Sequence, residues 1–299
     1  MTERRLQLLS PAKVNLTLEV GGLRPDGYHE IDSVVQVIDL ADTLEVEAAP
    51  PGVMELVVKG ADVPCGSENL VIRAAAAFFE VTGVEGGARF HLTKRIPIRA
   101  GLGGGSSNAA ATILALNSLY ETALPKSSLS SLAARVSSDA PLFIYGGTLR
   151  TTGRGEIVSE LPDAPELHLV IIKPQCGVST HWAYQQLHET PRCELGYWSC
   201  RAEVAVRAGD VQQLTECLHN DFDAVITAQF PEIYEAERAL LNAGALRSIL
   251  CGSGSAVFGL FKSGEEAARA ADTLTGGSSH VFLSRTLTRA ESIELMTPK

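Results

Sequence analysis

Four glycines stand within five residues in the stretch from Pro97 to Asn108, and an alanine-rich run follows directly. Glycine lets the backbone take positive φ and approach a ligand without a Cβ in the way. Residues 109–116 predict a helix, and Ser106, Ser107 and Asn108 are residue types that favour a helix N-cap. A glycine turn before a helix presents free N–H groups and the positive end of the helix dipole. The stretch therefore predicts a cradle for a phosphate group.

Two common phosphate loops do not fit this spacing. A Walker loop requires a lysine directly after its last glycine, and none follows here. A dinucleotide fingerprint requires a third glycine three positions after the second, where this chain has Ser106. The alternative that stays open is a flexible turn or a close-packed helix start with no ligand.

Composition limits the partners of this site. The chain has 299 residues, enough for two domains, and its 45% hydrophobic and 20% charged residues are typical of a globular protein. A net charge of −10 argues against nucleic-acid binding, because a phosphate backbone requires a basic face. An acidic chain that binds phosphate needs local positive charge. Lys94, Arg95 and Arg99 are candidates, and the alternative for each is a solvated strand edge.

The cysteines and the N-terminus indicate a location. The six cysteines are Cys65, Cys176, Cys193, Cys200, Cys217 and Cys251, with no C-x-x-C pair among them. This pattern predicts reduced thiols, and a buried structural thiol at Cys251. The first residues lack the apolar region of a signal peptide, and no apolar run approaches the length of a membrane span. We expect a cytoplasmic monomer or weak homodimer with no membrane partner.

Two segments near the N-terminus carry candidate binding residues. Residues 6–20 predict two strands around 10–15, and the alternation after Pro11 places Lys13 and Asn15 on one face, opposite the apolar face. Further on, Tyr28 and His29 follow the turn signal Pro-Asp-Gly. These rings can stack on and hydrogen-bond a planar ligand. The alternative is a tyrosine that packs the turn onto the sheet.

Three expectations concern the middle of the chain. Residues 31–48 predict β structure with a turn near Asp42. Asp139 follows a predicted helix at an end where the dipole disfavours a carboxylate, which indicates either a functional role or a cap for the turn before Pro141. The segment 162–165, Pro-Asp-Ala-Pro, predicts a boundary between domains 1–162 and 163–299. The strands and helices beyond it predict an α+β sandwich.

Four segments stand in the order of the motifs of GHMP small-molecule kinases. They are Pro11–Leu16, Pro97–Asn108, Ser138–Pro141 and Gly252–Gly259. The chain therefore resembles this superfamily over essentially its whole length. Two further segments, Arg24–Glu30 and Gly177–Thr180, resemble those of the branch whose members phosphorylate a cytidine diphosphate methylerythritol. The third and fourth motifs depart from the common pattern at Ala140 and Leu250-Cys251, both conservative in size.

The resemblance implies a two-domain α+β fold. The first domain is expected to be similar to the second domain of ribosomal protein S5, and the second to be a ferredoxin-like α/β sandwich. The implied reaction transfers the γ-phosphoryl group of ATP, accompanied by Mg²⁺, to the 2-hydroxyl of 4-(cytidine 5'-diphospho)-2-C-methyl-D-erythritol in the non-mevalonate isoprenoid pathway. The implied partners are these small molecules.

The resemblance also implies roles for individual residues. Asp139 matches the general base and Lys13 its catalytic partner. The ATP-binding positions are Pro97, Ile98, Arg99, Ala100, Gly101, Leu102, Gly103, Gly104, Gly105, Ser106, Ser107 and Asn69. The substrate-binding positions are Asn15, Tyr28, His29 and Tyr184, with Tyr28 and His29 at the cytosine end. The chain shows no dedicated carboxylate cage for a metal, and Mg²⁺ is expected to use phosphates, water and Ser107.

Two alternatives remain at this point. One is another GHMP kinase that acts on homoserine or a mevalonate derivative, and the segment Asp26–His29 argues against it because such a substrate has no cytosine to hold. The other is a catalytically silent nucleotide-binding regulator. The presence of both Lys13 and Asp139 argues against this second alternative.

Overall fold

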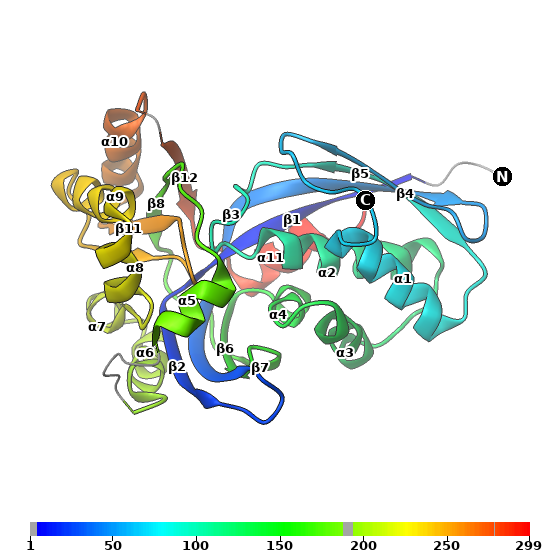
Figure 1. The fold of residues 1–299 in the computed structure, drawn as a ribbon, viewed down its shortest axis with the longest axis horizontal. Coiled ribbons are helices and arrows are strands. Elements are labelled where there is room, and N and C mark those ends of the chain that lie inside the picture. The colour runs from blue at the N-terminus through cyan, green and yellow to red at the C-terminus, as the bar shows by residue number, and fades with distance from the viewer. Residues whose placement is uncertain (1–4, 188–193, 278) are drawn as a thin grey trace.

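The computed structural model describes residues 5–187, 194–277 and 279–299, which build two sheets with helices around them (Figure 1). Eight strands form the first sheet and four form the second. The strands are β1 (Arg5–Asn15), β2 (Thr17–Leu23), β3 (His29–Ala49), β4 (Met54–Lys59), β5 (Gly87–Thr93), β6 (Thr148–Gly153), β7 (Ile157–Glu160), β8 (His168–Lys173), β9 (His219–Asn220), β10 (Arg247–Leu250), β11 (Val257–Phe261) and β12 (His280–Arg285). The helices are α1 (Leu70–Thr82), α2 (Gly104–Leu119), α3 (Lys126–Val136), α4 (Ala140–Tyr145), α5 (Thr180–Gln186), α6 (Tyr197–Ala208), α7 (Val211–Cys217), α8 (Asp223–Gln229), α9 (Pro231–Asn242), α10 (Gly264–Leu274) and α11 (Arg289–Met296).

Strand β3 is the spine of the larger sheet. It pairs antiparallel with β1, β2, β5 and β6 along its length. The predicted turn near Asp42 is wrong, because the strand continues through it and a register shift between Pro11 and Ala12 of β1 absorbs the irregularity. The two strands expected in 6–20 are present, but they part at Leu16 rather than within 10–15.

Helices cover one face of this sheet. Figure 1 shows α1, α2, α3, α4 and α11 beneath the strands. Ala109, Ala110 and Ala111 of α2 have no exposed surface, and their small side chains let α2 approach its neighbours closely. The helix that follows the glycine loop is therefore held firmly in the core.

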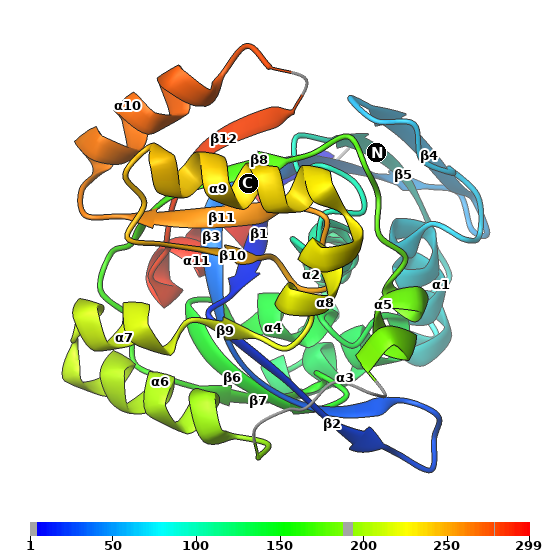
Figure 2. The ribbon, with the colours of Figure 1, turned by 60° about the vertical axis from the view of Figure 1, so that its left-hand side comes forward.

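The smaller sheet has the antiparallel order β10-β11-β8-β12 and buries both faces. Alternation along β8 sends Leu169 and Ile171 toward the core shared with β1 and β3, and Val170 and Ile172 toward α9 and α10. Figure 2 shows α9 lying over β8 and β11. This architecture confirms the predicted α+β class.

Besides the core that the two sheets share, two contacts join the C-terminal part of the chain to the larger sheet. The short strand β9 pairs in parallel with β2 of the larger sheet. The C-terminal helix α11 packs against β1, and Lys299 exchanges backbone hydrogen bonds with Gln7. The division at 162 stays a prediction. Within the described part of the chain, no helix combines the length and hydropathy that crossing a bilayer requires.

Candidate active site

The glycine loop leads into the N-terminus of α2, as the sequence predicts, but the cap differs from the expectation. The helix begins at Gly104, and the N-cap is Gly103 with φ 70°, so Ser106, Ser107 and Asn108 lie inside the first turns and do not cap it. Glycine suits the cap because its φ of 70° is strained for other residues and a Cβ would lie 3.0 Å from Cγ of Lys13. The side chains of Ser106 and Asn108 instead make hydrogen bonds to other elements.

The polar residues of this first turn have separate contacts. Ser106 Oγ lies 2.7 Å from Ser137 Oγ, and the amide of Asn108 donates to Asp42 and to Ser10. Ser107 Oγ is buried without a partner among the described residues. The first backbone bond of the helix runs from Ser107 N to the carbonyl of Gly103, so the amides just before it are those that a helix start offers to an anion.

A cavity of about 410 Å³ lies along this loop. Its wall includes Asn69 and every residue from Pro97 to Ser106, whereas Ser107 is not part of it. Asn69 is the N-cap of α1: its Oδ1 accepts from Val71 N and its Nδ2 donates to the carbonyl of Pro64. The amide of Asn69 therefore holds the adjoining loop, and residues 97–106 contribute more of the cavity lining than any other segment.

The three predicted cations do not all line one cavity. Lys94 is buried in an ion pair with Asp42 and also donates to Asn108, which neutralises much of its charge. Arg99 lines the same cavity as Lys94, and Arg95 lines a neighbouring one. Lys94 and Arg99 are thus the basic residues at the glycine loop.

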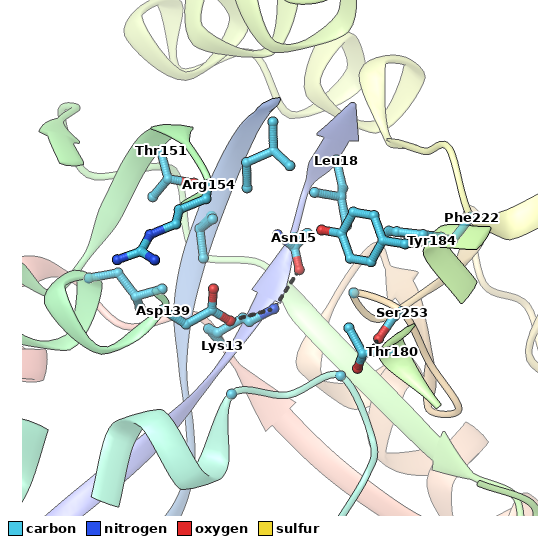
Figure 3. Close-up of a pocket in the computed structure, with 16 residues that line it drawn as sticks. Lys13, Asn15, Leu18, Asp139, Thr151, Arg154, Thr180, Tyr184, Phe222 and Ser253 are labelled. Carbon is cyan, nitrogen blue, oxygen red and sulfur yellow. Dashed lines mark hydrogen bonds and ion pairs between the residues drawn. The ribbon is translucent and has the colours of Figure 1, made fainter. Parts of the chain in front are cut away.

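A second cavity, of about 190 Å³, adjoins the first, and Gly101 and Gly103 line both of them. Figure 3 shows Lys13, Asn15 and Asp139 converging in it. Lys13 Nζ donates to Asn15 Oδ1 at 2.6 Å and lies 3.7 Å from Asp139 Oδ2. The Lys13 side chain is 6% exposed and that of Asp139 is 40% exposed. The carboxylate is therefore open to a ligand, while the ammonium is fixed behind it.

Asp139 lies at the start of a helix, whereas the sequence predicted that it follows the end of one. Helix α3 ends at Val136, and Asp139 is the N-cap residue of the short helix α4. Its carboxylate faces the favourable end of the dipole of α4 and makes no capping hydrogen bond. The carboxylate is therefore not used to fix the turn before Pro141.

A third cavity of about 660 Å³ adjoins the second at Asp139, Arg154, Thr180 and Tyr184. The ring of His29 stacks on Tyr184 with centroids 5.2 Å apart, and its Nδ1 lies 3.0 Å from the carbonyl oxygen of Gly21. Burial raises the pKa of the Tyr184 phenol to about 12, with Asp139 adding to the shift, so Tyr184 keeps its proton at neutral pH.

Tyr28 lies at the mouth of this third cavity. It is 51% exposed, and the guanidinium of Arg154 lies over its ring at 5.0 Å from the centroid. The side chain therefore does not pack the turn onto the sheet, which was the alternative left open by the sequence. Tyr28, His29 and Tyr184 give the cavity the aromatic surface on which a flat ligand can stack.

Sequence reasoning missed Arg154 as a site residue. It stands between Gly153 and Gly155, both with positive φ, at the turn between β6 and β7, and it lines both the second and the third cavity. The signal that could have found it is a cation between two glycines in a tight turn, since such a turn exposes the side chain between them.

A second glycine segment, Gly252–Gly259, follows β10, and the chain here packs directly on the glycine loop. A Cβ on Gly101 would lie only 1.7 Å from the carbonyl oxygen of Cys251, and Ala256 N donates to the carbonyl of Ala100. Cys251 is fully buried, and burial raises the pKa of its thiol to about 12, which confirms the expected buried thiol. Five cysteines are free, and Cys193 lies outside the described residues.

Family models match both halves of the chain. The GHMP kinases N terminal domain matches residues 69–147, and the GHMP kinases C terminal domain matches residues 202–293. The chain therefore has the two domains of a GHMP kinase. A solved 4-(cytidine 5'-diphospho)-2C-methyl-D-erythritol kinase is 34% identical with a TM-score of 0.78, covering 94% of this chain and 98% of that one.

Relatives with the same kind of name are similar over nearly the whole chain. The 4-diphosphocytidyl-2-C-methyl-D-erythritol kinase of Pelotomaculum thermopropionicum is 41% identical over 93% of this chain and 96% of the relative. That of Moorella thermoacetica is 41% identical over 94% of this chain and 99% of the relative. The chain belongs to the 4-diphosphocytidyl-2-C-methyl-D-erythritol kinase family. A homoserine kinase from Cytophaga hutchinsonii, 20% identical with a TM-score of 0.76 and coverage of 100% of this chain and 98% of that one, shares the fold.

Proposed function

We propose that this chain phosphorylates the 2-hydroxyl of 4-(cytidine 5'-diphospho)-2-C-methyl-D-erythritol with ATP in the non-mevalonate isoprenoid pathway. One observation carries the proposal: the cavity that holds Lys13 and Asp139 shares walls with the glycine-loop cavity on one side and with the aromatic cavity on the other. The phosphoryl donor and the acceptor can thus meet at the two charged side chains.

The glycine loop is proposed to bind the triphosphate of ATP. Backbone amides at the start of α2 are rigid donors, because the helix behind them is buried. Arg99 on the wall of the same cavity adds positive charge in an otherwise acidic protein. Phosphoryl transfer depends mostly on positioning and charge stabilisation, which a fixed amide cradle supplies.

The aromatic cavity is proposed to bind the cytidine end of the acceptor. Cytosine is flat and polar at its edge, and Tyr28 and Tyr184 offer faces for stacking while His29 offers a ring nitrogen. Arg154 lines both this cavity and the cavity that holds Lys13 and Asp139, which we call the reaction cavity. The diphosphate of such a substrate would pass between the two. Arginine is suited to this position because its planar fork matches phosphate oxygens.

Asp139 is proposed to act as the general base. An alcohol is a poor nucleophile at neutral pH, and a carboxylate within hydrogen-bond reach can take its proton as the bond to phosphorus forms. The exposed carboxylate of Asp139 is free of capping bonds and can approach a hydroxyl in the cavity. The ammonium of Lys13 lies 3.7 Å from that carboxylate and can neutralise charge on the transferring phosphoryl group. Asn15 holds the Lys13 ammonium in place.

Mg²⁺ is proposed to arrive with ATP. The unpartnered hydroxyl of Ser107, buried next to the last loop residue of the cavity wall, is the protein oxygen proposed to reach such an ion, together with phosphate oxygens and water. When bound, the ion would supply charge neutralisation for the phosphates. The proposed division of labour places ATP and catalysis on residues 1–162 and part of the acceptor site, through Tyr184, on residues 163–299.

Location and assembly are part of the same proposal. Free thiols at the five described cysteines support a reducing, cytoplasmic environment. A monomer or weak homodimer is expected, and sedimentation at two protein concentrations would distinguish these states.

One assay tests the function directly. ATP consumption is measured with the cytidyl substrate, homoserine and mevalonate side by side, with ³¹P NMR of the product to locate the new phosphate. We expect turnover with the cytidyl substrate alone and a phosphomonoester on its 2-oxygen. Turnover with homoserine or mevalonate instead would contradict the proposed identity of the acceptor. ATP binding without turnover of any of the three would favour a catalytically silent regulator.

A further inference from the structure

The segment from His219 to Asp223 contacts β2, the ring of Tyr184 and the backbone of residues 250–252. Its backbone pairs with β2, with Asp221 N donating to the carbonyl of Leu18. Phe222 reaches the cavity and contacts the Tyr184 ring edge-to-face at 4.9 Å (Figure 3). Asn220, two residues earlier, does not line any of the three cavities, and its side chain points to the second glycine segment.

The amide of Asn220 is fully engaged. The residue is 4% exposed, and its Nδ2 donates to the carbonyls of both Leu250 (2.9 Å) and Gly252 (2.8 Å). Its Oδ1 accepts from Phe222 N at 3.0 Å. Of the natural side chains of this size, only an asparagine supplies two donors and an acceptor here, since aspartate is isosteric but has no donors when ionised.

The carbonyls that Asn220 holds belong to a segment in tight contact with the reacting groups. The carbonyl oxygen of Cys251 abuts Gly101 of the first glycine loop, and a Cβ on Gly252 would lie 3.4 Å from Lys13 Nζ. Next along the chain, Ser253 Oγ lies 3.0 Å from Thr180 Oγ1, at the start of α5, which carries Tyr184. A shift of residues 250–253 would therefore move surfaces that touch both the ATP loop and Lys13.

We propose that Asn220 is a positioning residue for phosphoryl transfer. It fixes the segment 250–253 against Gly101 and Lys13, and so sets the alignment of the phosphoryl donor with the acceptor hydroxyl. This inference rests on the proposed function, because it takes the Lys13 cavity as the place of reaction. Misplacement by about 1 Å is enough to cost about 100-fold in rate.

Two variants separate positioning from plain stability. Asn220→Asp keeps the volume and the acceptor to Phe222 N but replaces both donors with oxygen facing two carbonyls, and Asn220→Ala removes the amide. The matched control is Asn117→Ala, because Asn117 Oδ1 likewise fixes a loop, accepting from Leu124 N and from Thr122 Oγ1 at the far end of α2. Steady-state kinetics with the cytidyl substrate and ATP, and hydrogen exchange of residues 250–256, are measured for each.

We expect kcat to fall about 10- to 100-fold in Asn220→Asp, while KM for each substrate changes less than about threefold. Exchange of the 250–256 amides should become faster in both Asn220 variants and stay unchanged in Asn117→Ala. A purely structural role would lower thermal stability in all three variants without this separation of kcat from KM. If Asn220→Ala does not fold, the isosteric Asn220→Asp decides alone.

The inference is overturned if Asn220→Asp retains kcat within about threefold of the wild type, or if Asn117→Ala loses as much kcat. Unchanged exchange at 250–256 in the Asn220 variants would overturn it as well. Failure of the proposed function is distinct, because in that case the unaltered protein itself does not turn over the cytidyl substrate. The exchange experiment then still decides whether Asn220 holds the segment.

Discussion

The ammonium of Lys13 lies between two oxygens of unequal freedom: Asn15 Oδ1 at 2.6 Å, which is buried, and Asp139 Oδ2 at 3.7 Å, which is open to the cavity. Lys13 is fixed by the first and faces the second. A longer contact to the carboxylate leaves Asp139 able to turn toward a hydroxyl without losing the charge beside it. This asymmetry agrees with the proposed roles, in which Asn15 anchors Lys13 and Asp139 accepts the proton.

Asp139→Asn should abolish most turnover while leaving ATP affinity nearly unchanged. The amide keeps the shape but cannot accept the proton of the acceptor hydroxyl, and general-base catalysis contributes about 10²- to 10⁴-fold. Rapid-quench turnover and calorimetric ATP binding check the two parts. Asp210→Asn is the control, since Asp210 is also an N-cap carboxylate, on α7, and lines none of the three cavities. Near-normal turnover in Asp139→Asn would remove this residue from the mechanism.

Tyr28→Ala should raise KM for the cytidyl substrate about tenfold with little change in kcat or in ATP affinity. The expected loss corresponds to one stacking contact with a base, about 1–3 kcal/mol. Steady-state kinetics at varied cytidyl substrate gives the value. Tyr234→Ala is a matched control, because Tyr234 is similarly exposed, at 53%, but lies on α9. An effect confined to ATP would contradict the cytosine assignment.

Gly101→Ala should weaken both folding and ATP binding. Alanine at φ 77° is strained, and its Cβ would meet the carbonyl oxygen of Cys251, so the two glycine segments would have to separate. A loss of about 3 kcal/mol in the free energy of unfolding is expected. Gly209→Ala isolates the strain alone, about 1 kcal/mol, because φ is 66° there and no atom lies within 4 Å of the added Cβ. Equal losses in urea unfolding would show that the contact with Cys251 does not matter.

The sequence predicted those parts of the site that depend on local pattern. Strand alternation placed Lys13 and Asn15 on one face, and glycine spacing indicated the loop before α2. Contacts between distant segments were beyond it: the start of α4 beside Asp139, the burial of Lys94 by Asp42, and the position of Arg154 all depend on how β3, β6 and the loops meet. The predicted N-cap was wrong because the cap residue, Gly103, has positive φ and packs against the Lys13 side chain. Residue propensity alone does not reveal that contact.

A half-buried pair of carboxyl groups, Asp223 and Glu237, predicts a pH dependence of stability. Burial and the neighbouring Asp223 raise the pKa of Glu237 to about 9, against the weaker opposing effect of Arg247. Burial also raises the pKa of Asp223, whose carboxylate accepts from Leu250 N. Glu237 is therefore protonated in the folded protein at neutral pH but ionised in the unfolded chain, whose carboxyl has the ordinary pKa of about 4.3. The folded state thus binds the extra proton.

The free energy of unfolding should consequently fall as pH rises from about 4.3 toward 9 and level off above that, with a slope of at most about 1.4 kcal/mol per pH unit from this group. Glu237→Gln keeps a donor toward Asp223 without a titrating proton, so its stability should depend less on pH and exceed that of the wild type at pH 8. Urea unfolding at pH 6, 7 and 8 measures the slopes. Glu235→Gln, exposed on the same helix, should behave as the wild type. Parallel curves for Glu237→Gln and the wild type would mean that Glu237 is ionised in the folded protein, and the pair would then have to be stabilised by Arg247.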